Sequence, residues 1–191
     1  MALITNLSVP TGVNDPTPTL MPKLQYRFRV HFDFDDGRLV TSNVMSVTRP
    51  TFTHDEMTLD TYNSRIYLAG KHTWEPVTIV MRDDVSNNVI NQLEPQLEKQ
   101  INMANQSAPV AGAQYKFKTT IETLDGGNAT AAALDTWELF GCYIQNIAYG
   151  ESNYATSDAQ QITVTLRYDN ATHEATSSPG GNASSDGVTA E

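Results

Sequence analysis

The period at which apolar side chains recur constrains the fold of this chain more than any other feature. From residue 24 to residue 34, every second position is Leu, Tyr, Phe or Val, and the positions between carry Gln, Arg, His or Asp. A similar alternation returns at 77–82, 115–123 and 162–168. Successive side chains of a β-strand point to opposite faces, so this period is typical of half-buried strands. We therefore expect antiparallel sheets around one core.

Further strands are expected where the alternation is weaker, at 39–47, 51–59, 65–69 and 137–147. Asp35-Asp36-Gly37 is a turn signal of the Asp-Gly type that joins the first two strands. His54 and Glu56 interrupt the alternation of the strand around them. Gly70-Lys71 is expected to form a tight turn.

A different period indicates one helix. Apolar side chains recur there at spacings of three and four residues: Val89, Ile90, Leu93, Leu97, Ile101 and Ala104. Ser86 and Asn87 are candidate N-caps. Pro95 predicts a kink or a split into two short helices, because proline removes a backbone hydrogen bond. Together the patterns predict a mainly β fold, an antiparallel β-sandwich or barrel with one flanking α-helix.

Composition separates a globular middle from two arms. Residues 1–22 hold four of the nine prolines and little periodicity, so an extended arm is expected there. Residues 171–191 are rich in Ser, Thr, Gly and Ala, and predict a second arm. The folded domain is expected at 23–170. No apolar run approaches the ~20 residues of a membrane helix, and the start does not resemble a secretory signal, so no membrane anchor is expected.

Charge is distributed unevenly along the chain. The net charge is -10, from 22 acids and 12 bases. Residues 119–191 hold ten of those acids and a single base, Arg167. A protein that grips nucleic acid needs the reverse, because Lys and Arg contacts to phosphate dominate that affinity. We therefore expect no specific DNA binding. The alternative role for the acidity is to keep the protein in solution.

The sequence carries no recognisable catalytic or metal-binding motif. The four histidines, His31, His54, His72 and His173, lack the spacing of metal ligands. His31 alternates out of a strand and is expected at the surface. Cys142 is the single cysteine and is expected to be a small buried apolar group. No nucleophile elbow or phosphate-binding loop is present. We expect a protein that is not an enzyme and uses no cofactor or metal.

An open antiparallel sheet raises a separate question, because its edges leave backbone N–H and C=O groups unpaired. A ring of identical copies can pair these edges with one another, provided that the rotation between copies closes. The run at 160–165 places uncharged polar side chains opposite the core, which suits a wet inner wall as well as an ordinary solvent face.

Two long segments carry a resemblance to a known family. The first, at 60–84, contains Tyr62-Asn63-Ser64-Arg65, Gly70-Lys71, Trp74-Glu75-Pro76 and Arg82-Asp83-Asp84. The second runs from Gly141-Cys142-Tyr143-Ile144 to Arg167-Tyr168-Asp169-Asn170. With these motifs the chain resembles the tail-tube proteins of contractile-tailed, T4-like bacteriophages, over residues 24–171.

The resemblance implies a structural virion protein. It implies hexameric rings in which each copy adds sheet to a continuous β-barrel, and rings that stack into the inner tail tube. The implied partners are other copies, the tail sheath, the tape-measure protein in the lumen, and the baseplate and tail-terminator proteins. Genome DNA would pass through without specific binding. The implied location is the virion, after assembly in the host cytoplasm.

Two groups of residues are candidates for roles in such a tube. Aromatic side chains and arginine are enriched where proteins grip one another, which favours one group for subunit and ring contacts: Tyr62, Asn63, Arg65, Lys71 and Trp74. The alternative for these five is packing within a hairpin, above all for Trp74. The second group is expected to place carboxylates on the wall of the lumen: Glu122, Asp125, Glu138, Glu151 and Asp158.

Other functions remain open from the sequence. A baseplate tube initiator, or a tube protein of the type VI secretion or pyocin kind, would share the fold. A β-sandwich module that binds a ligand, for example a sugar stacked on Tyr and Trp, is a more distant alternative. Such a module would need a concave aromatic groove, whereas the aromatic residues fall on several separate strands and turns.

Overall fold

The computed structural model describes residues 23–34, 37–40, 42–125, 133–155 and 157–175. The predicted arm at 1–22, and residues 176–191 of the arm predicted at 171–191, lie outside these residues. The described elements run in this order: β1 (Phe28–Phe34), β2 (Gly37–Val40), β3 (Val44–Val47), β4 (Phe52–Thr61), β5 (Ser64–Trp74), β6 (Val77–Arg82), α1 (Asn88–Gln100), a short 3-10 helix (Gly112–Gln114), β7 (Phe117–Leu124), β8 (Ala133–Ala148), β9 (Gln161–Arg167) and β10 (Asn170–Ala175).

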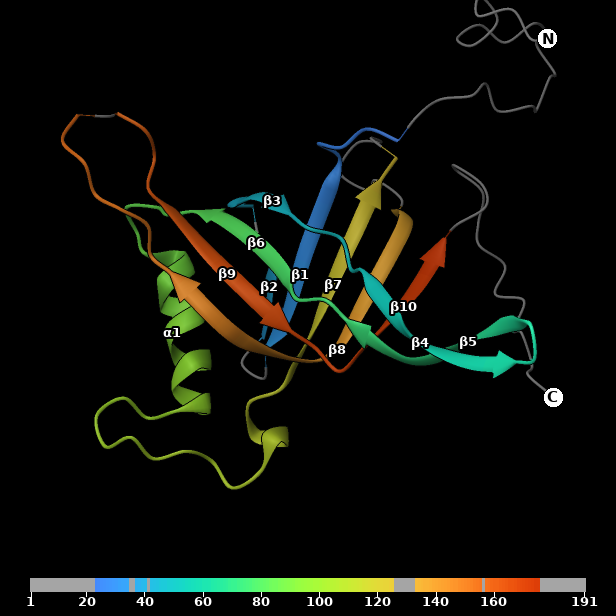
Figure 1. Ribbon diagram of the computed structural model, residues 1–191. Helices are drawn as coiled ribbons and strands as arrows, with labels where there is room; N and C mark the ends of the chain where they lie inside the picture. The colour runs from blue at the N-terminus through green and yellow to red at the C-terminus, as the bar shows by residue number, and fades with distance from the viewer. Residues whose placement is uncertain (1–22, 35–36, 41, 126–132, 156, 176–191) are drawn as a thin grey trace, which may run out of the picture.

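Most strands belong to one antiparallel path in the order β2-β1-β7-β8-β9-β6-β3, with β10 also paired to β8 (Figure 1). The long strand β8 serves two layers. Its first half pairs with β7 and β10, and its second half pairs with β9. Between the halves lies Gly141, which has a φ of 67°, a conformation that glycine adopts without a Cβ penalty. This glycine lets one strand pass from one layer to the other.

The two layers enclose a single core. Its members come from β1, β6, β7, β8, β9 and α1, with Tyr168 just after β9: Val30, Phe32, Val77, Ile79, Met81, Val89, Leu93, Phe117, Ile121, Leu139, Cys142, Ile144, Ile162, Val164, Leu166 and Tyr168. Burial raises the pKa of the Cys142 thiol to about 11, so this thiol stays protonated at neutral pH. The predicted fold class, a mainly β antiparallel domain with one flanking helix, is confirmed.

Helix α1 differs from its prediction in two respects. It is one helix of 13 residues with Pro95 inside it, so the predicted split into two short helices is wrong. Asn87 is at the N-cap, but its side chain makes no capping hydrogen bond. The carboxylate of Asp84 instead accepts a bond from the backbone N–H of Asn88 at 2.8 Å. This bond, with one from the Asn88 side chain, holds the pKa of Asp84 below its usual value.

Side-chain amides dock α1 onto the sheets. Gln96 is buried and donates to the carbonyl of Tyr115 at 2.6 Å. The Gln100 amide donates to the carbonyl of Ile144 at 3.0 Å, and its oxygen accepts from the Ile144 N–H at 3.0 Å. These three bonds provide partners for the carbonyl of Tyr115 and for the N–H and carbonyl of Ile144. Among the described residues, no helix has the length and apolar character needed to cross a membrane.

The last strand extends the sheet past the predicted domain boundary at residue 170. β10 pairs with β8 in the register His173 to Trp137. The two rings stack with their centroids 4.3 Å apart, and His173 also contacts the buried Asp135. Burial alone would raise the pKa of Asp135, but its bonds to His173 and Lys23 outweigh that effect and lower it.

Strands β4 and β5 form a separate two-stranded sheet, a hairpin that projects from the body (Figure 1). Their pairing begins at Phe52 with Trp74 and ends at Thr61 with Ser64, so the turn is Tyr62-Asn63. Gly70 and Lys71 lie inside β5, and the tight turn predicted there is wrong. All ten residues of β4 are exposed.

Candidate docking surface on the projecting hairpin

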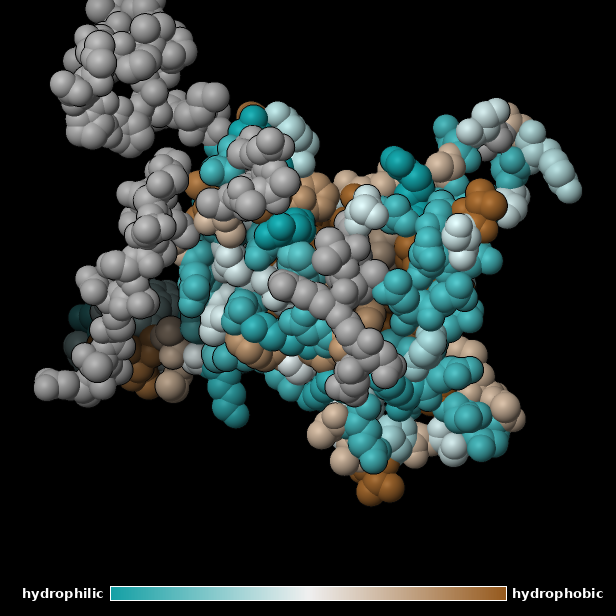
Figure 2. Space-filling model, turned by 180° about the vertical axis from the view of Figure 1, so that it is seen from behind, coloured by the Kyte–Doolittle hydropathy of each residue, from teal (hydrophilic) through white to brown (hydrophobic). Residues whose placement is uncertain are grey.

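The register of the hairpin sorts its side chains onto two contrasting faces. Cross-strand partners share a face, because successive side chains on one strand point to opposite sides. One face, here called the apolar face, is built toward the tip from two cross-strand pairs: Met57 with Leu68, and Leu59 with Ile66. The four aliphatic and thioether side chains of this face are 43% to 50% exposed. Figure 2 shows hydrophobic atoms gathered where this hairpin projects at the left of the view.

A β-bulge interrupts the pairing of the two strands. The register shifts between His54 and Glu56, where Gly70 and Lys71 of β5 together lie opposite Asp55. β4 has no extra residue, so Met57 lies on the face opposite His54, because they are three residues apart. The backbone approaches closely here, since a Cβ on Gly70 would be 2.9 Å from the Asp55 carbonyl oxygen.

The opposite face of the hairpin, here called the polar face, is polar toward the tip and carries the rings of Phe52, His54, His72 and Trp74 at the root. Arg65 donates to the carboxylate of its cross-strand partner Asp60 at 2.8 Å. Thr58 pairs with Tyr67, and Glu56 pairs with Ala69. The ion pair is well exposed, with 66% of the Arg65 side chain and 75% of the Asp60 side chain accessible, so it adds little stability. The hairpin is therefore amphipathic although both of its faces are open to solvent.

Aromatic rings join the hairpin to the body. Trp74 lies with its ring centroid 5.1 Å from that of Phe52 and 5.7 Å from that of Tyr168. Tyr168 is buried in the core, and burial raises the pKa of its hydroxyl to about 12. Trp74 is thus partly buried at the root of the hairpin, while its tip has no such support.

All five residues predicted for subunit contacts lie on this hairpin. Tyr62 and Asn63 form its turn, and the Tyr62 side chain is fully exposed. Arg65 lies on the polar face, Lys71 is one of the two residues opposite Asp55 in the bulge, and Trp74 lies at the root. The apolar face was missed by that prediction. Its sign in the sequence is the two-residue spacing of Met57 and Leu59 and of Ile66 and Leu68.

The carboxylates predicted for a lumen wall lie on β7, on β8 and in the segments that follow these strands. Glu122 accepts a bond from Arg29 at 2.7 Å and contacts His31 at 3.1 Å, and Glu138 pairs with Lys118 at 2.7 Å. The carbonyl oxygen of Asp125 accepts a bond from Arg27 at 2.6 Å. Glu151 and Asp158 are exposed in the segment between β8 and β9. His31 is 4% exposed, so its predicted surface position is wrong.

Glu122 makes stability depend on pH. Burial favours its neutral form, but the hydrogen bond and charge of Arg29, with the contribution of His31, hold its pKa below the usual 4.5. A carboxyl with a lowered folded-state pKa stabilises the fold above its unfolded pKa, and this contribution is lost as the pH falls through the folded-state value. The wild-type protein is thus expected to exceed Glu122→Gln in stability at neutral pH, and the gap should narrow below pH 4.5.

Denaturant unfolding of both proteins at a series of pH values measures this gap. Glu138→Gln is the matched control, because Glu138 is paired on the neighbouring strand but its side chain is 34% exposed. A gap between the wild type and Glu122→Gln that stayed constant down to strongly acidic pH would contradict the prediction.

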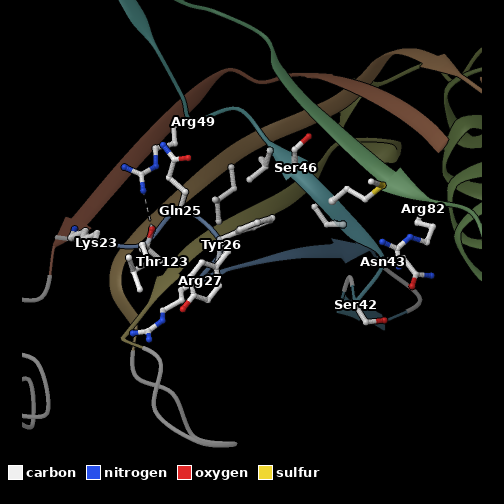
Figure 3. A pocket seen from close by; sticks show the side chains of 16 residues that line it. Lys23, Gln25, Tyr26, Arg27, Ser42, Asn43, Ser46, Arg49, Arg82 and Thr123 are labelled. Atoms are coloured by element: carbon white, nitrogen blue, oxygen red, sulfur yellow. Dashed lines mark hydrogen bonds between the residues drawn. The ribbon is translucent and has the colours of Figure 1, made fainter. Parts of the chain in front are cut away.

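A cleft of about 1050 Å³ opens between β3 and the segment that leads into β1 (Figure 3). Lys23, Arg27, Arg49 and Arg82 are its charged lining residues. Lys23 pairs with Asp135 at 3.3 Å, and Arg49 donates to the Thr123 hydroxyl at 3.3 Å, the dashed line in Figure 3. With the bond from Arg27 to Asp125, three of these four side chains are held by the chain itself. The described residues contain no group of three or more His, Cys, Asp or Glu side chains suited to a metal ion.

The fold is similar to that of chains from several contractile injection systems. A chain of the anti-feeding prophage (AFP) baseplate aligns with a TM-score of 0.64 at 14% identity, over 81% of this chain and 97% of its own length. A chain of the extracellular contractile injection system PVC, in its extended sheath-tube complex, gives 0.63 at 18% identity, over 81% and 93%. A chain of the AFP tube terminating cap gives 0.65 at 13% identity, over 87% and 100%.

Sequence comparison adds no family to this likeness. No model of a known protein family matches the chain, and no curated protein matches it by sequence. At 13% to 18% identity, the structural likeness shows a shared fold.

Proposed function

We propose that this chain is a structural subunit of the tail tube of a contractile-tailed bacteriophage, in which it polymerises as stacked hexameric rings. The observation that carries the proposal is the β4–β5 hairpin with its half-exposed apolar face. A two-stranded hairpin has marginal stability by itself in water. Docking of its apolar face on another copy removes that surface from water and supplies the missing support.

The shared fold supports the same proposal. The similar chains come from a six-fold symmetrised baseplate, a sheath-tube complex and a tube terminating cap. β3 ends the described strand path with one side unpaired by any described strand, so it offers an edge for pairing between copies. Closing such edges around a ring would give the continuous β-barrel of the assembled tube. The chain then works through its assembly, without an enzymatic active site.

The proposed tube sets the partners and the location. Other copies, the sheath, the baseplate and the tail terminator would contact its outside or its ends, and the tape-measure protein would fill its lumen. The location is the phage virion, assembled in the host cytoplasm. A net charge of -10 suits a wall past which DNA slides, because a negative wall does not bind phosphate. Glu151 and Asp158 are the exposed lumen candidates, and tight DNA retention by assembled tubes at moderate salt would rule out this role.

Electron microscopy of the purified protein tests the proposal. Long hollow tubes are expected for a polymerising tube subunit. Isolated rings would favour the alternative of a baseplate initiator or a cap. The likeness to the AFP cap chain is the reason to test for this alternative. Monomers at high concentration would favour a β-sandwich ligand-binding module and would overturn the proposal. A tube of the type VI secretion or pyocin kind is distinguished by identifying the other proteins present in purified particles that contain this chain.

Arg65→Glu tests the predicted ring contacts on the polar face. The change removes the Arg65 pair with Asp60 and places two like charges directly opposite each other near the tip. The monomer should stay folded, because both side chains are largely exposed, and tube formation should be impaired. Sedimentation of assembled material measures the effect, with Lys71→Gln as a change on the same strand away from the tip. Tubes of normal length and yield would remove Arg65 from the contact set.

A further inference from the structure

Two histidines meet near the root of the hairpin, on the polar face. His54 and His72 are 18 residues apart in the sequence but are direct cross-strand partners in the hairpin. Their ring centroids lie 5.9 Å apart, with the ring planes at 63°. Both side chains are exposed. Direct partners in an antiparallel pair have Cβ atoms about 4.5–5.5 Å apart, within the span over which two side chains can share one ligand.

The nitrogens of these two rings are available for a ligand. In the part of the chain that the structure describes, neither ring makes a hydrogen bond or an ion pair, and their contacts are with other rings. The other two histidines differ, because His31 contacts the carboxylate of Glu122 and His173 contacts that of Asp135. An exposed imidazole pair without a carboxylate partner is free to bind a cation through its lone pairs.

The spacing of the rings fits a single metal ion. A transition metal lies about 2.0–2.1 Å from an imidazole nitrogen, which places it about 3.2 Å from the ring centroid. Two imidazoles on one ion therefore have centroids at most about 6.4 Å apart. The observed 5.9 Å lies within this limit, and small side-chain rotations bring one nitrogen of each ring toward a common point.

We propose that His54 and His72 bind one divalent transition-metal ion of the zinc, nickel or copper class, and that the ion links β4 to β5. Imidazole is a preferred ligand of these metals, whereas Mg²⁺ and Ca²⁺ select oxygen ligands. Two protein ligands leave coordination positions for water. Because the ion bridges both strands of a hairpin that is marginal alone, its binding free energy stabilises the paired state.

Neighbouring aromatic rings frame the pair. Phe52 lies edge-on to His54 with centroids 5.4 Å apart, and Trp74 lies edge-on to His72 at 6.2 Å. These rings restrict the imidazoles at the root of the hairpin, where Trp74 is anchored on Tyr168. Trp74 is also a fluorophore next to the site, so a quenching ion bound there is expected to lower the Trp74 emission.

Copper quenching of Trp74 fluorescence tests the site. The chain has two tryptophans, so the Trp137→Phe variant leaves Trp74 as the only reporter. The measurement is made at a concentration at which sedimentation shows single copies. Added Cu²⁺ is expected to quench Trp74 with saturation at one ion per chain, and a large excess of Zn²⁺ is expected to restore the emission by displacing the more tightly bound Cu²⁺. His54→Gln and His72→Gln should each weaken binding at least tenfold, and the double change should abolish it.

Two controls make the outcome decisive. His173→Gln should leave the quenching of Trp74 unchanged, since its ring stacks on Trp137 elsewhere in the fold. At a Zn²⁺ concentration ten times the dissociation constant, hydrogen exchange of the β4 and β5 amides should slow about tenfold, but not in the double variant. Equal quenching with and without the two histidines would overturn the proposal, as would binding that leaves hairpin exchange unaltered. Neither measurement requires tubes, so failure here is separate from failure of the proposed function.

Discussion

Ile66→Asp is expected to abolish tube formation while the domain itself stays folded. The Ile66 side chain is 50% exposed on the apolar face, opposite Leu59, so the monomer tolerates a carboxylate there. In the assembled state the same carboxylate would be buried against another copy without a partner. The change loses a share of the about 1.5–3 kcal/mol that burying an isoleucine contributes, and adds the desolvation cost of a charge. Each copy in a tube repeats this loss.

Thr58→Asp is the matched control, because Thr58 neighbours Leu59 on the strand but lies on the polar face. Both variants introduce one carboxylate into β4 or β5, and only Ile66→Asp should stop assembly in electron micrographs and in sedimentation. The unfolding free energy of each variant should stay within about 0.5 kcal/mol of the wild type, as is usual for surface changes. Normal tubes from Ile66→Asp would show that the apolar face is not a docking surface.

Gly141→Ala is expected to lower the stability of the monomer by about 1–2 kcal/mol, because the left-handed backbone conformation is unfavourable for any residue with a Cβ. The φ of 67° is imposed where β8 passes between the two layers. The added methyl group would also meet Asp169, whose carboxyl carbon would be 2.9 Å away. Asp169 pairs with Lys116 at 2.5 Å, so moving its side chain disturbs that pair.

Thermal unfolding measures this loss, which should appear as a fall of about 3–8 °C in the melting temperature. Gly112→Ala is the control, since a Cβ there would meet its nearest atom at 3.5 Å, an ordinary contact, and the backbone needs no left-handed conformation. Equal melting temperatures for Gly141→Ala and the wild type would mean that β8 can bend in another way.

The sequence predicted the strands best where alternation is strict. β1, β6, β7 and β9 each keep a period of two, and their inward residues form the core. The sequence predicted turns and helix caps less well, because the local residue signals for them were overridden by strand pairing or by another capping residue. Gly70-Lys71 has the composition of a turn, yet it lies within β5, because Gly70 is needed where the bulge brings two backbones together. The side chain of Asn87 was expected to cap α1, and the carboxylate of Asp84 does so instead.

The candidate site was likewise predicted only in part from the sequence. That residues 60–74 carry the contacts was a prediction from their aromatic and charged composition, and the structure shows that they form one projecting hairpin. Which side chains share a face could not be deduced, since one extra residue at Gly70-Lys71 exchanges the faces of β5. The partners of Glu122 were equally hidden, because Arg29 and His31 are more than 90 residues away along the chain.

By itself, the sequence determined the period-two strands, the single helix and the absence of a recognisable catalytic motif, because all three are written in neighbouring residues. Only the tertiary structure decided the hairpin register, the meeting of His54 with His72 and the pairing of Glu122 with Arg29. The physical reason is that strand pairing joins residues far apart in the chain, and a shift of one residue moves a side chain to the other face.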